Sequence, residues 1–300
     1  MRINTLFLDS SQRLEKRKGG GGHGSSGKSS GSKSSGSSSG SKGSSSKGSS
    51  SGSSSSRPLG PSVPIKSSGR TSNVQSYANG VPVASPIPAG QIFAGRLIGG
   101  GTRTNIFGTR RYGSGYPGIA STGVTGRGFP FGFWPVTFGA GAVNLHNQEY
   151  GNPNNSSRPG GPLFVAPFQP INGSETYRVL SDNATVQSLI TIIAANCSLT
   201  TTTITAVPFN DSSQASNQPK PEQVIEYYRS SSIALTLDGY NNSAVFSSND
   251  SMPDTPLPSN LNTTFLDCIN QTIGAGAPLF DGAQSVYGQP YSVKYKEKIH

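Results

Sequence analysis

Hydrophobic residues recur with a regular period only in the second half of the chain. Residues 176–180 have the pattern of a short strand, and Ser181, Asp182 and Asn183 follow as candidate helix N-caps. Beyond the caps, apolar residues recur at helical spacing, which predicts a helix with one buried face. That face comprises Val186, Leu189, Ile190, Ile193 and Cys197.

Two strands and two helices are predicted farther along the chain. The Thr-rich run 200–207 is β-branched and predicts a strand, and residues 233–237 predict another that Asp238 and Gly239 end. Pro221 is expected to open a helix that runs to residue 229 and buries Val224 and Tyr228.

A last helix is predicted over 262–273, with Asn262 as its cap and Gly274 just past its end. Its buried face comprises Phe265, Cys268 and Ile269. The alternation of strands and helices predicts a small α/β (α+β) domain.

The first third of the chain has no such pattern. From residue 19 to residue 56 it contains only Gly, Ser and Lys apart from His23, so no apolar surface offsets the entropy of ordering. The predicted organisation has five parts. These are an atypical N-terminal segment (1–18), a disordered low-complexity tail (19–69), a Gly-rich loop region with Arg and aromatic residues (70–172), the glycosylated domain (173–281) and a flexible tail (282–300).

Charge divides the chain in the same way. Residues 1–127 contain seventeen Lys and Arg against two acidic residues, whereas residues 128–300 contain seven against twelve. The basic arm suits an acidic polysaccharide, an anionic lipid or a nucleic acid, or its lysines merely keep the tail soluble. A destination in the secretory lumen makes nucleic acid the least expected partner.

N-glycosylation acceptors are the most informative chemical feature. Ten Asn-x-Ser/Thr sequons lie between residues 154 and 270, where chance would place about three. The acceptors are Asn154, Asn155, Asn172, Asn183, Asn196, Asn210, Asn241, Asn249, Asn262 and Asn270. Because these glycans are added in the secretory lumen, this half of the chain is expected to end outside the cell or on its surface.

The only two cysteines, Cys197 and Cys268, lie within the sequon-rich part. In an oxidising lumen the simplest expectation is one disulfide between them, which closes a loop worth ~4 kcal/mol. Two free buried thiols and pairing between molecules are the alternatives.

Entry into the lumen requires a targeting segment, but no proper signal peptide precedes Asp9. Either a leader is missing from this sequence, or the sequons are unused, or a later segment is the membrane signal. Residues 128–145, called the apolar strip here, are uncharged over 18 positions, but Pro130 and Pro135 make them a poor helix. The strip is expected to pack on the domain, to touch a partner or to enter a membrane. Lys16-Arg17 has the form of a dibasic processing site.

Motifs of catalysis and cofactor binding are weak. Residues 22–29 match the phosphate-binding pattern G-x-x-x-x-G-K-[ST], but no strand precedes them and no helix follows, so no cofactor is predicted. His23, His146 and His300 have no metal-ligand spacing, and no nucleophile elbow is present. No catalytic or metal-binding residue is therefore assigned.

Two runs of sequence, 126–135 (GRGFPFGFWP) and 231–243 (SSIALTLDGYNNS), resemble a group of uncharacterised extracellular glycoproteins of mushroom-forming (basidiomycete) fungi. The resemblance covers roughly residues 90–281 and implies secretion or surface display without an assigned activity. The expected function is a non-enzymatic secreted or cell-wall-associated glycoprotein. A membrane-anchored surface protein that uses residues 128–145 and a cell-wall hydrolase are the alternatives.

Overall fold

The computed structural model describes residues 62–67, 70–75, 79–138, 148–210, 217–247, 249 and 251–280, and for residues 62–75 it describes the backbone strands alone. The predicted segment 1–18, most of the tail 19–69 and the tail 282–300 therefore lie outside the described residues, as does the processing site at Lys16 and Arg17.

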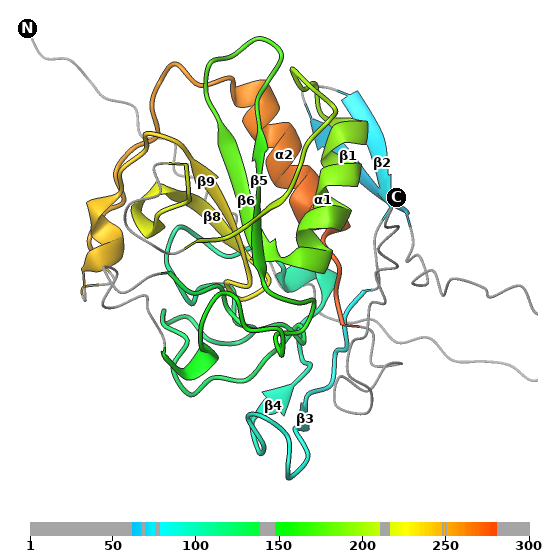
Figure 1. Ribbon diagram of the computed structural model, residues 1–300, viewed down its shortest axis with the longest axis vertical. Coiled ribbons are helices and arrows are strands. Elements are labelled where there is room, and N and C mark those ends of the chain that lie inside the picture. Colours follow the sequence, from blue (N-terminus) through cyan, green and yellow to red (C-terminus); the bar gives the residue numbers. More distant parts are fainter. Residues whose placement is uncertain are drawn as a thin grey trace, which may run out of the picture. The chain divides into compact units, whose positions relative to one another are not determined.

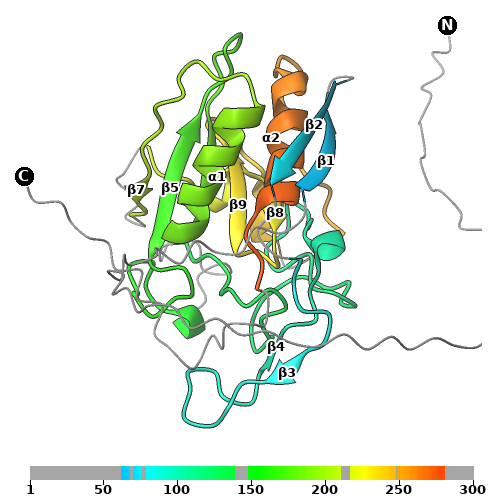
Figure 2. The same ribbon diagram turned by 90° about the vertical axis from the view of Figure 1, so that its right-hand side faces the viewer.

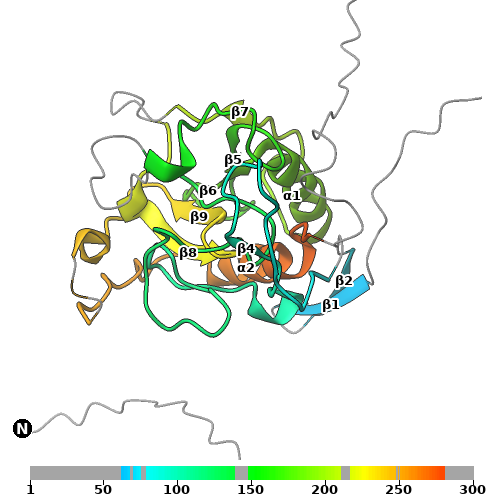
Figure 3. The ribbon, with the colours of Figure 1, turned by 90° about the horizontal axis from the view of Figure 1, so that it is seen from below.

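Five antiparallel strands form the central sheet, in the order β7-β5-β6-β9-β8 (Figures 1 and 3; β7 is labelled in Figure 3). The strands are β5 (Leu163–Phe168), β6 (Tyr177–Asp182), β7 (Val207–Pro208), β8 (Val224–Tyr228) and β9 (Ile233–Leu237). Two hairpins, β5–β6 and β8–β9, pair through β6 and β9, so the two centre strands come from different parts of the chain. The mixed α+β fold expected from the sequence is confirmed.

Helices α1 (Asn183–Asn196) and α2 (Thr263–Gly276) lie side by side over one face of this sheet (Figures 2 and 3). Asp182 ends β6 and caps α1, because its carboxylate accepts a hydrogen bond from the Thr185 amide at 2.9 Å. The Asn262 side chain caps α2 in the same way through the Phe265 amide, at 3.0 Å, which confirms the predicted cap.

Both faces of the sheet are buried, although it is antiparallel. Along β6, Val179 faces the helices and its neighbour Leu180 faces the opposite side, as the two-residue period of a strand requires. The opposite side packs against residues 79–138, which supply a dense group of aromatic side chains. We call this group, together with Tyr150 and with Tyr227 of β8, the aromatic core; its members from residues 79–138 include Tyr112, Tyr116, Phe129, Trp134 and Phe138.

Residues 79–138 fold mostly without long strands. They contain β3 (Ser85–Pro86) and β4 (Leu97–Ile98), which pair with each other, and the 3₁₀ turn Arg103–Asn105. Two further strands, β1 (Ser62–Ser67) and β2 (Arg70–Gln75), form a hairpin. The remaining 3₁₀ turns are Gln148–Tyr150, Pro221–Gln223 and Ser243–Phe246.

The helix predicted from Pro221 to residue 229 is wrong. Pro221 opens only a 3₁₀ turn, and the chain continues as strand β8. Val224 and Tyr228 are four residues apart, which is the spacing of one helix face. In β8 a bulge between Val224 and Glu226 shifts the alternation, so Val224 packs on the side of the aromatic core and Tyr228 on the side of the helices. Valine, isoleucine and two tyrosines favour the strand, and the hairpin with β9 provides its hydrogen bonds.

Two other boundaries differ from the sequence prediction. Of the Thr-rich run 200–207, only Val207 lies in a strand. Most of the run is exposed and has no apolar face that packs against the rest of the domain. Helix α2 continues through Gly274 to Gly276 instead of ending before Gly274. The ring of Phe107 packs so closely on Gly274 that a Cβ atom there would collide with it, so this glycine serves packing within the helix.

Candidate functional site: the disulfide and the acceptor asparagines

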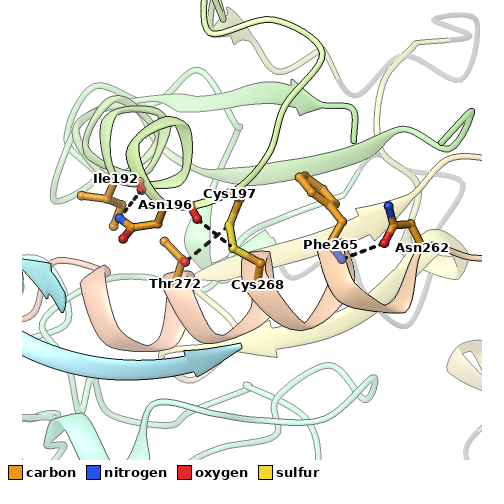
Figure 4. The surroundings of a disulfide bond; sticks show 7 residues. All are labelled: Ile192, Asn196, Cys197, Asn262, Phe265, Cys268 and Thr272. Carbon is orange, nitrogen blue, oxygen red and sulfur yellow. Dashed lines mark hydrogen bonds between the residues drawn. A yellow bond between two sulfur atoms is a disulfide. The ribbon is translucent and has the colours of Figure 1, made fainter. Parts of the chain in front are cut away.

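A disulfide joins the end of α1 to the middle of α2 (Figure 4). Cys197 follows the last residue of α1 and bonds to Cys268, with the two Cα atoms 5.8 Å apart. Both side chains are buried, at 6 % and 8 % exposure, among Ile193, Ile269 and Thr272. The predicted intramolecular bridge is confirmed, and it indicates an oxidising compartment.

None of the ten acceptor asparagines is buried. Five are exposed, namely Asn154, Asn172, Asn210, Asn241 and Asn249. Five are half-buried, namely Asn155, Asn183, Asn196, Asn262 and Asn270. The folded chain thus leaves each acceptor with at least partial contact with solvent.

The Ser and Thr residues of the sequons differ more in solvent exposure than the acceptor asparagines do. Thr185 and Thr272, the hydroxyl residues for Asn183 and Asn270, are fully buried on the inner faces of α1 and α2. The other hydroxyl residues that the structure describes are exposed, and Ser212 lies outside it. No sequence pattern separates these two classes, because helical position decides which way the third residue of a sequon faces.

Residues 129–138 of the apolar strip pack inside the folded chain. Phe129, Phe131, Phe133, Trp134 and Phe138 are each at most 7 % exposed. For this part of the strip, the expectation of packing on the domain is confirmed. Among the residues that the structure describes, no helix is long and apolar enough to cross a bilayer; residues 139–147 lie outside them.

A second notable site is the loop between β8 and β9, residues 229–232, which is buried rather than exposed. Arg229, Ser230 and Ser231 have φ angles of +53°, +50° and +63°. Left-handed backbone costs a non-glycine residue on the order of 1 kcal/mol or more, so three in succession require strong support from their surroundings.

The support comes from hydrogen bonds to distant segments. The Arg229 guanidinium, fully buried, pairs with Asp182 at 2.7 Å and stacks 3.5 Å over the ring of Phe133. It also donates to the Thr185 hydroxyl at 3.0 Å and to the Pro278 carbonyl at 2.8 Å. We call residues 229–232 with Ser181, Asp182 and Thr185 the Arg229 hub.

The backbone and serines of this loop bind the segment 79–138. Ser231 accepts a hydrogen bond from the Gly113 amide at 2.8 Å, and its carbonyl accepts one from Val136 at 2.8 Å. Ser230 donates to the Gly115 carbonyl at 3.1 Å. Since the loop residues are 4 % exposed or less, these serines face no solvent and form structural bonds.

Arginines of the segment 79–138 also bond within the chain. Arg103 donates to the Ala277 carbonyl, and burial lowers the pKa of Arg103 to about 10. Arg110 donates to the Tyr240 hydroxyl, and Arg127 stacks over Tyr116. These arginines of the predicted Gly-rich loop region are thus half-buried and form bonds within the folded chain.

Among the described residues, Asp238 and Asp254 are each bonded to different partners. Asp238 pairs with Arg178 at 2.7 Å, whereas Asp254 bonds to Asn242 at 2.8 Å and pairs with Arg111. Within the described part of the chain, no group of three or more His, Cys, Asp and Glu side chains is placed to hold a metal ion.

Glu226 on β8 is the acidic residue with the most perturbed environment. Burial raises the pKa of Glu226 from 4.5 to about 7, against the opposing charge of Arg110. The native state therefore retains a proton that the unfolded chain releases, so stability falls as pH rises from about 4.5 to 7. Glu226→Gln is expected to raise the free energy of unfolding by about 2–3 kcal/mol at pH 8 and to leave it unchanged at pH 4.

Urea unfolding at both pH values measures this effect. Glu222→Gln, the same change of side chain four positions earlier, is the matched control and should leave the difference between pH 4 and pH 8 as in the native protein. A Glu226→Gln variant with the same pH dependence as the native protein would contradict the expected role of this carboxyl.

Comparisons with models of known protein families, with curated proteins and with solved structures find no match to this chain. The resemblance to fungal extracellular glycoproteins stays a prediction.

Proposed function

We propose that this protein is a non-enzymatic glycoprotein, secreted or associated with the cell wall or cell surface. In this proposal the disulfide-stapled α+β domain carries N-glycans on its acceptor asparagines. The basic N-terminal arm binds an anionic polysaccharide or another acidic component of the wall. The role is structural or one of interaction.

The observation that carries the proposal is the Cys197–Cys268 bridge, which lies among the acceptors. Asn196 directly precedes one cysteine and Asn270 follows the other by two residues. Disulfides form and persist in the compartments through which glycoproteins pass. The solvent contact of all ten acceptor asparagines supports the same conclusion.

The packing of residues 129–138 in the domain favours this proposal over a membrane anchor that uses residues 128–145. Insertion of these residues into a membrane as a helix would remove Phe129, Phe133 and Trp134 from their buried positions in the folded domain. Burying one such aromatic ring stabilises a fold by about 1.5–3 kcal/mol.

Intact mass of the protein made in a eukaryotic secretory host tests the proposal. The protein is collected from medium, wall and detergent extracts and weighed before and after enzymatic removal of N-glycans. We expect a species from the medium or the wall that loses several glycan masses and contains the disulfide. An unglycosylated intracellular species would contradict the proposal, and a glycosylated species that only detergent extracts would favour the membrane-anchored alternative.

A further inference from the structure

We propose that closure of the Cys197–Cys268 bridge withdraws two acceptors, Asn196 and Asn270, from N-glycosylation. Only the reduced chain is then an efficient substrate at these two positions, so their occupancy reports whether glycan transfer preceded oxidation. This inference rests on the proposed function, because it assumes that the chain meets an oligosaccharyltransferase.

The transfer reaction sets two structural requirements. The Asn Nδ2 attacks C1 of the first sugar of a polyprenyl-pyrophosphate-linked oligosaccharide. The C–O bond to the pyrophosphate breaks, Nδ2 loses one proton, and the lipid pyrophosphate leaves. The nitrogen must therefore be free to react, and the hydroxyl residue two positions later must be accessible to the enzyme that reads the sequon.

Asn196 fails the first requirement in the bridged protein. Its Nδ2 donates a hydrogen bond to the Ile192 carbonyl at 2.7 Å, inside the last turn of α1 (Figure 4). The middle residue of its sequon is Cys197 itself, which the bridge fixes beside α2 with 5.8 Å between the Cα atoms. The backbone of Cys197 is already extended (φ −113°, ψ 145°), but the covalent bond holds this residue against α2, so the sequon cannot move away from the two helices into the active site of the transferase.

Asn270 fails the second requirement. Its hydroxyl residue, Thr272, is fully buried, and the Thr272 Oγ1 lies 3.6 Å from the Sγ of Cys197. Asn270 is itself held, because its Oδ1 accepts a hydrogen bond from the Tyr228 hydroxyl at 2.5 Å. The bridge thus lies directly over the group that the transferase would have to reach.

Two other acceptors provide references within the same molecule. Asn172 and its hydroxyl residue Ser174 are exposed in the β5–β6 loop. Asn262 lies on α2 with Cys268, but it caps the helix through its Oδ1, which leaves Nδ2 outside that bond, and its hydroxyl residue Thr264 is exposed. Neither acceptor depends on the bridge.

A third acceptor, Asn183, distinguishes a local effect of the bridge from unfolding of the whole domain. Thr185, the hydroxyl residue of Asn183, is fully buried at the opposite end of α1, where it bonds to Asp182 and Arg229. Loss of the bridge should open the region around Cys197 and Cys268 and leave Asn183 masked.

The full chain, made without glycans in bacteria and oxidised, tests the proposal. It is incubated with purified oligosaccharyltransferase and a polyprenyl-pyrophosphate-linked oligosaccharide, with and without dithiothreitol, and occupancy is measured for each acceptor by peptide mass spectrometry. A Cys268→Ala variant, which keeps both sequons intact, is treated in the same way without reductant.

In the oxidised protein we expect Asn196 and Asn270 to reach less than a fifth of the occupancy of Asn172. Reduction or Cys268→Ala should raise both at least fivefold, while Asn172 and Asn262 change less than twofold and Asn183 stays low. Occupancy at Asn196 and Asn270 equal to that of Asn172 in the oxidised protein would overturn the proposal. The proposal would also be overturned if reduction did not raise the occupancy of Asn196 and Asn270, or if it raised the occupancy of Asn183 equally. The proposed function fails separately, when the cell-made protein lacks glycans at every acceptor including Asn172.

Discussion

An Arg229→Met variant is expected to unfold with a free energy lower by about 3–5 kcal/mol, because it leaves the buried Asp182 carboxylate without its cation. Methionine has a similar length and stays apolar against Phe133, so the loss of charge and hydrogen bonds dominates the effect. Urea unfolding at pH 7, followed by the fluorescence of Trp134, the one tryptophan of the chain, measures this loss.

Arg178→Met is the matched control. It breaks the ion pair with Asp238, whose side chain is 36 % exposed, and exposed pairs contribute about 0–1 kcal/mol. Adding Asp182→Asn to Arg229→Met should recover part of the loss, because the amide oxygen still caps α1 and no charge remains buried. A cost for Arg229→Met no larger than that for Arg178→Met would contradict the stabilising role of the buried pair.

Replacing both cysteines by alanine is expected to lower the free energy of unfolding by about 4 kcal/mol, since the bridge closes a loop of about 72 residues. In a domain of this size, the melting temperature should fall by about 10 °C. Alanine suits the site because Cys197 and Cys268 are buried among apolar side chains.

Dithiothreitol provides the control for this prediction. It should destabilise the native protein as much as the double substitution does and should leave the double variant unchanged. A loss below about 1 kcal/mol would mean that the bridge hardly restrains the unfolded chain.

The sequence predicted those elements whose local signals agree with their tertiary contacts. Strand β9 has the predicted bounds, and α1 begins after one of the three predicted caps, Asp182. The buried face of α2, with Phe265, Cys268 and Ile269, is also as predicted. In each case periodicity, capping and burial favour the same structure.

The sequence did not predict the sheet as a whole, because its long-range pairing has no local signal. Strand β5 lies in the stretch 70–172, for which the sequence predicts a Gly-rich loop region, although its continuous run of apolar residues fits a buried strand. Strand β8 differs from the predicted helix because the spacing of Val224 and Tyr228 suits one helix face, whereas a bulge in the strand buries them on opposite faces of the sheet. Pairing with β9 decided the outcome.

The Arg229 hub could not be predicted from residue types. Arginine is rarely buried, and a run of Arg and Ser between two strands is typical of an exposed loop. Positive φ angles are expected at glycine, yet here Arg229, Ser230 and Ser231 adopt them. The disulfide was predictable because two cysteines in a sequon-rich segment have few other partners. The orientation of Thr185 and Thr272 was not, because it depends on tertiary packing.

The connections of the Arg229 hub have a consequence for biosynthesis. Its bonds reach from the Ile106 carbonyl, which accepts from the Arg229 amide, to the Pro278 carbonyl near the end of α2. At typical rates of translation, roughly 10–30 s separate the synthesis of these two residues. For much of that interval the nascent chain carries the aromatic side chains of residues 129–138 before β8, β9 and α2, which help to cover them, have all been synthesised. The domain therefore cannot complete its packing until Pro278 has been synthesised, and a chaperone that meets the chain earlier would find part of these rings uncovered.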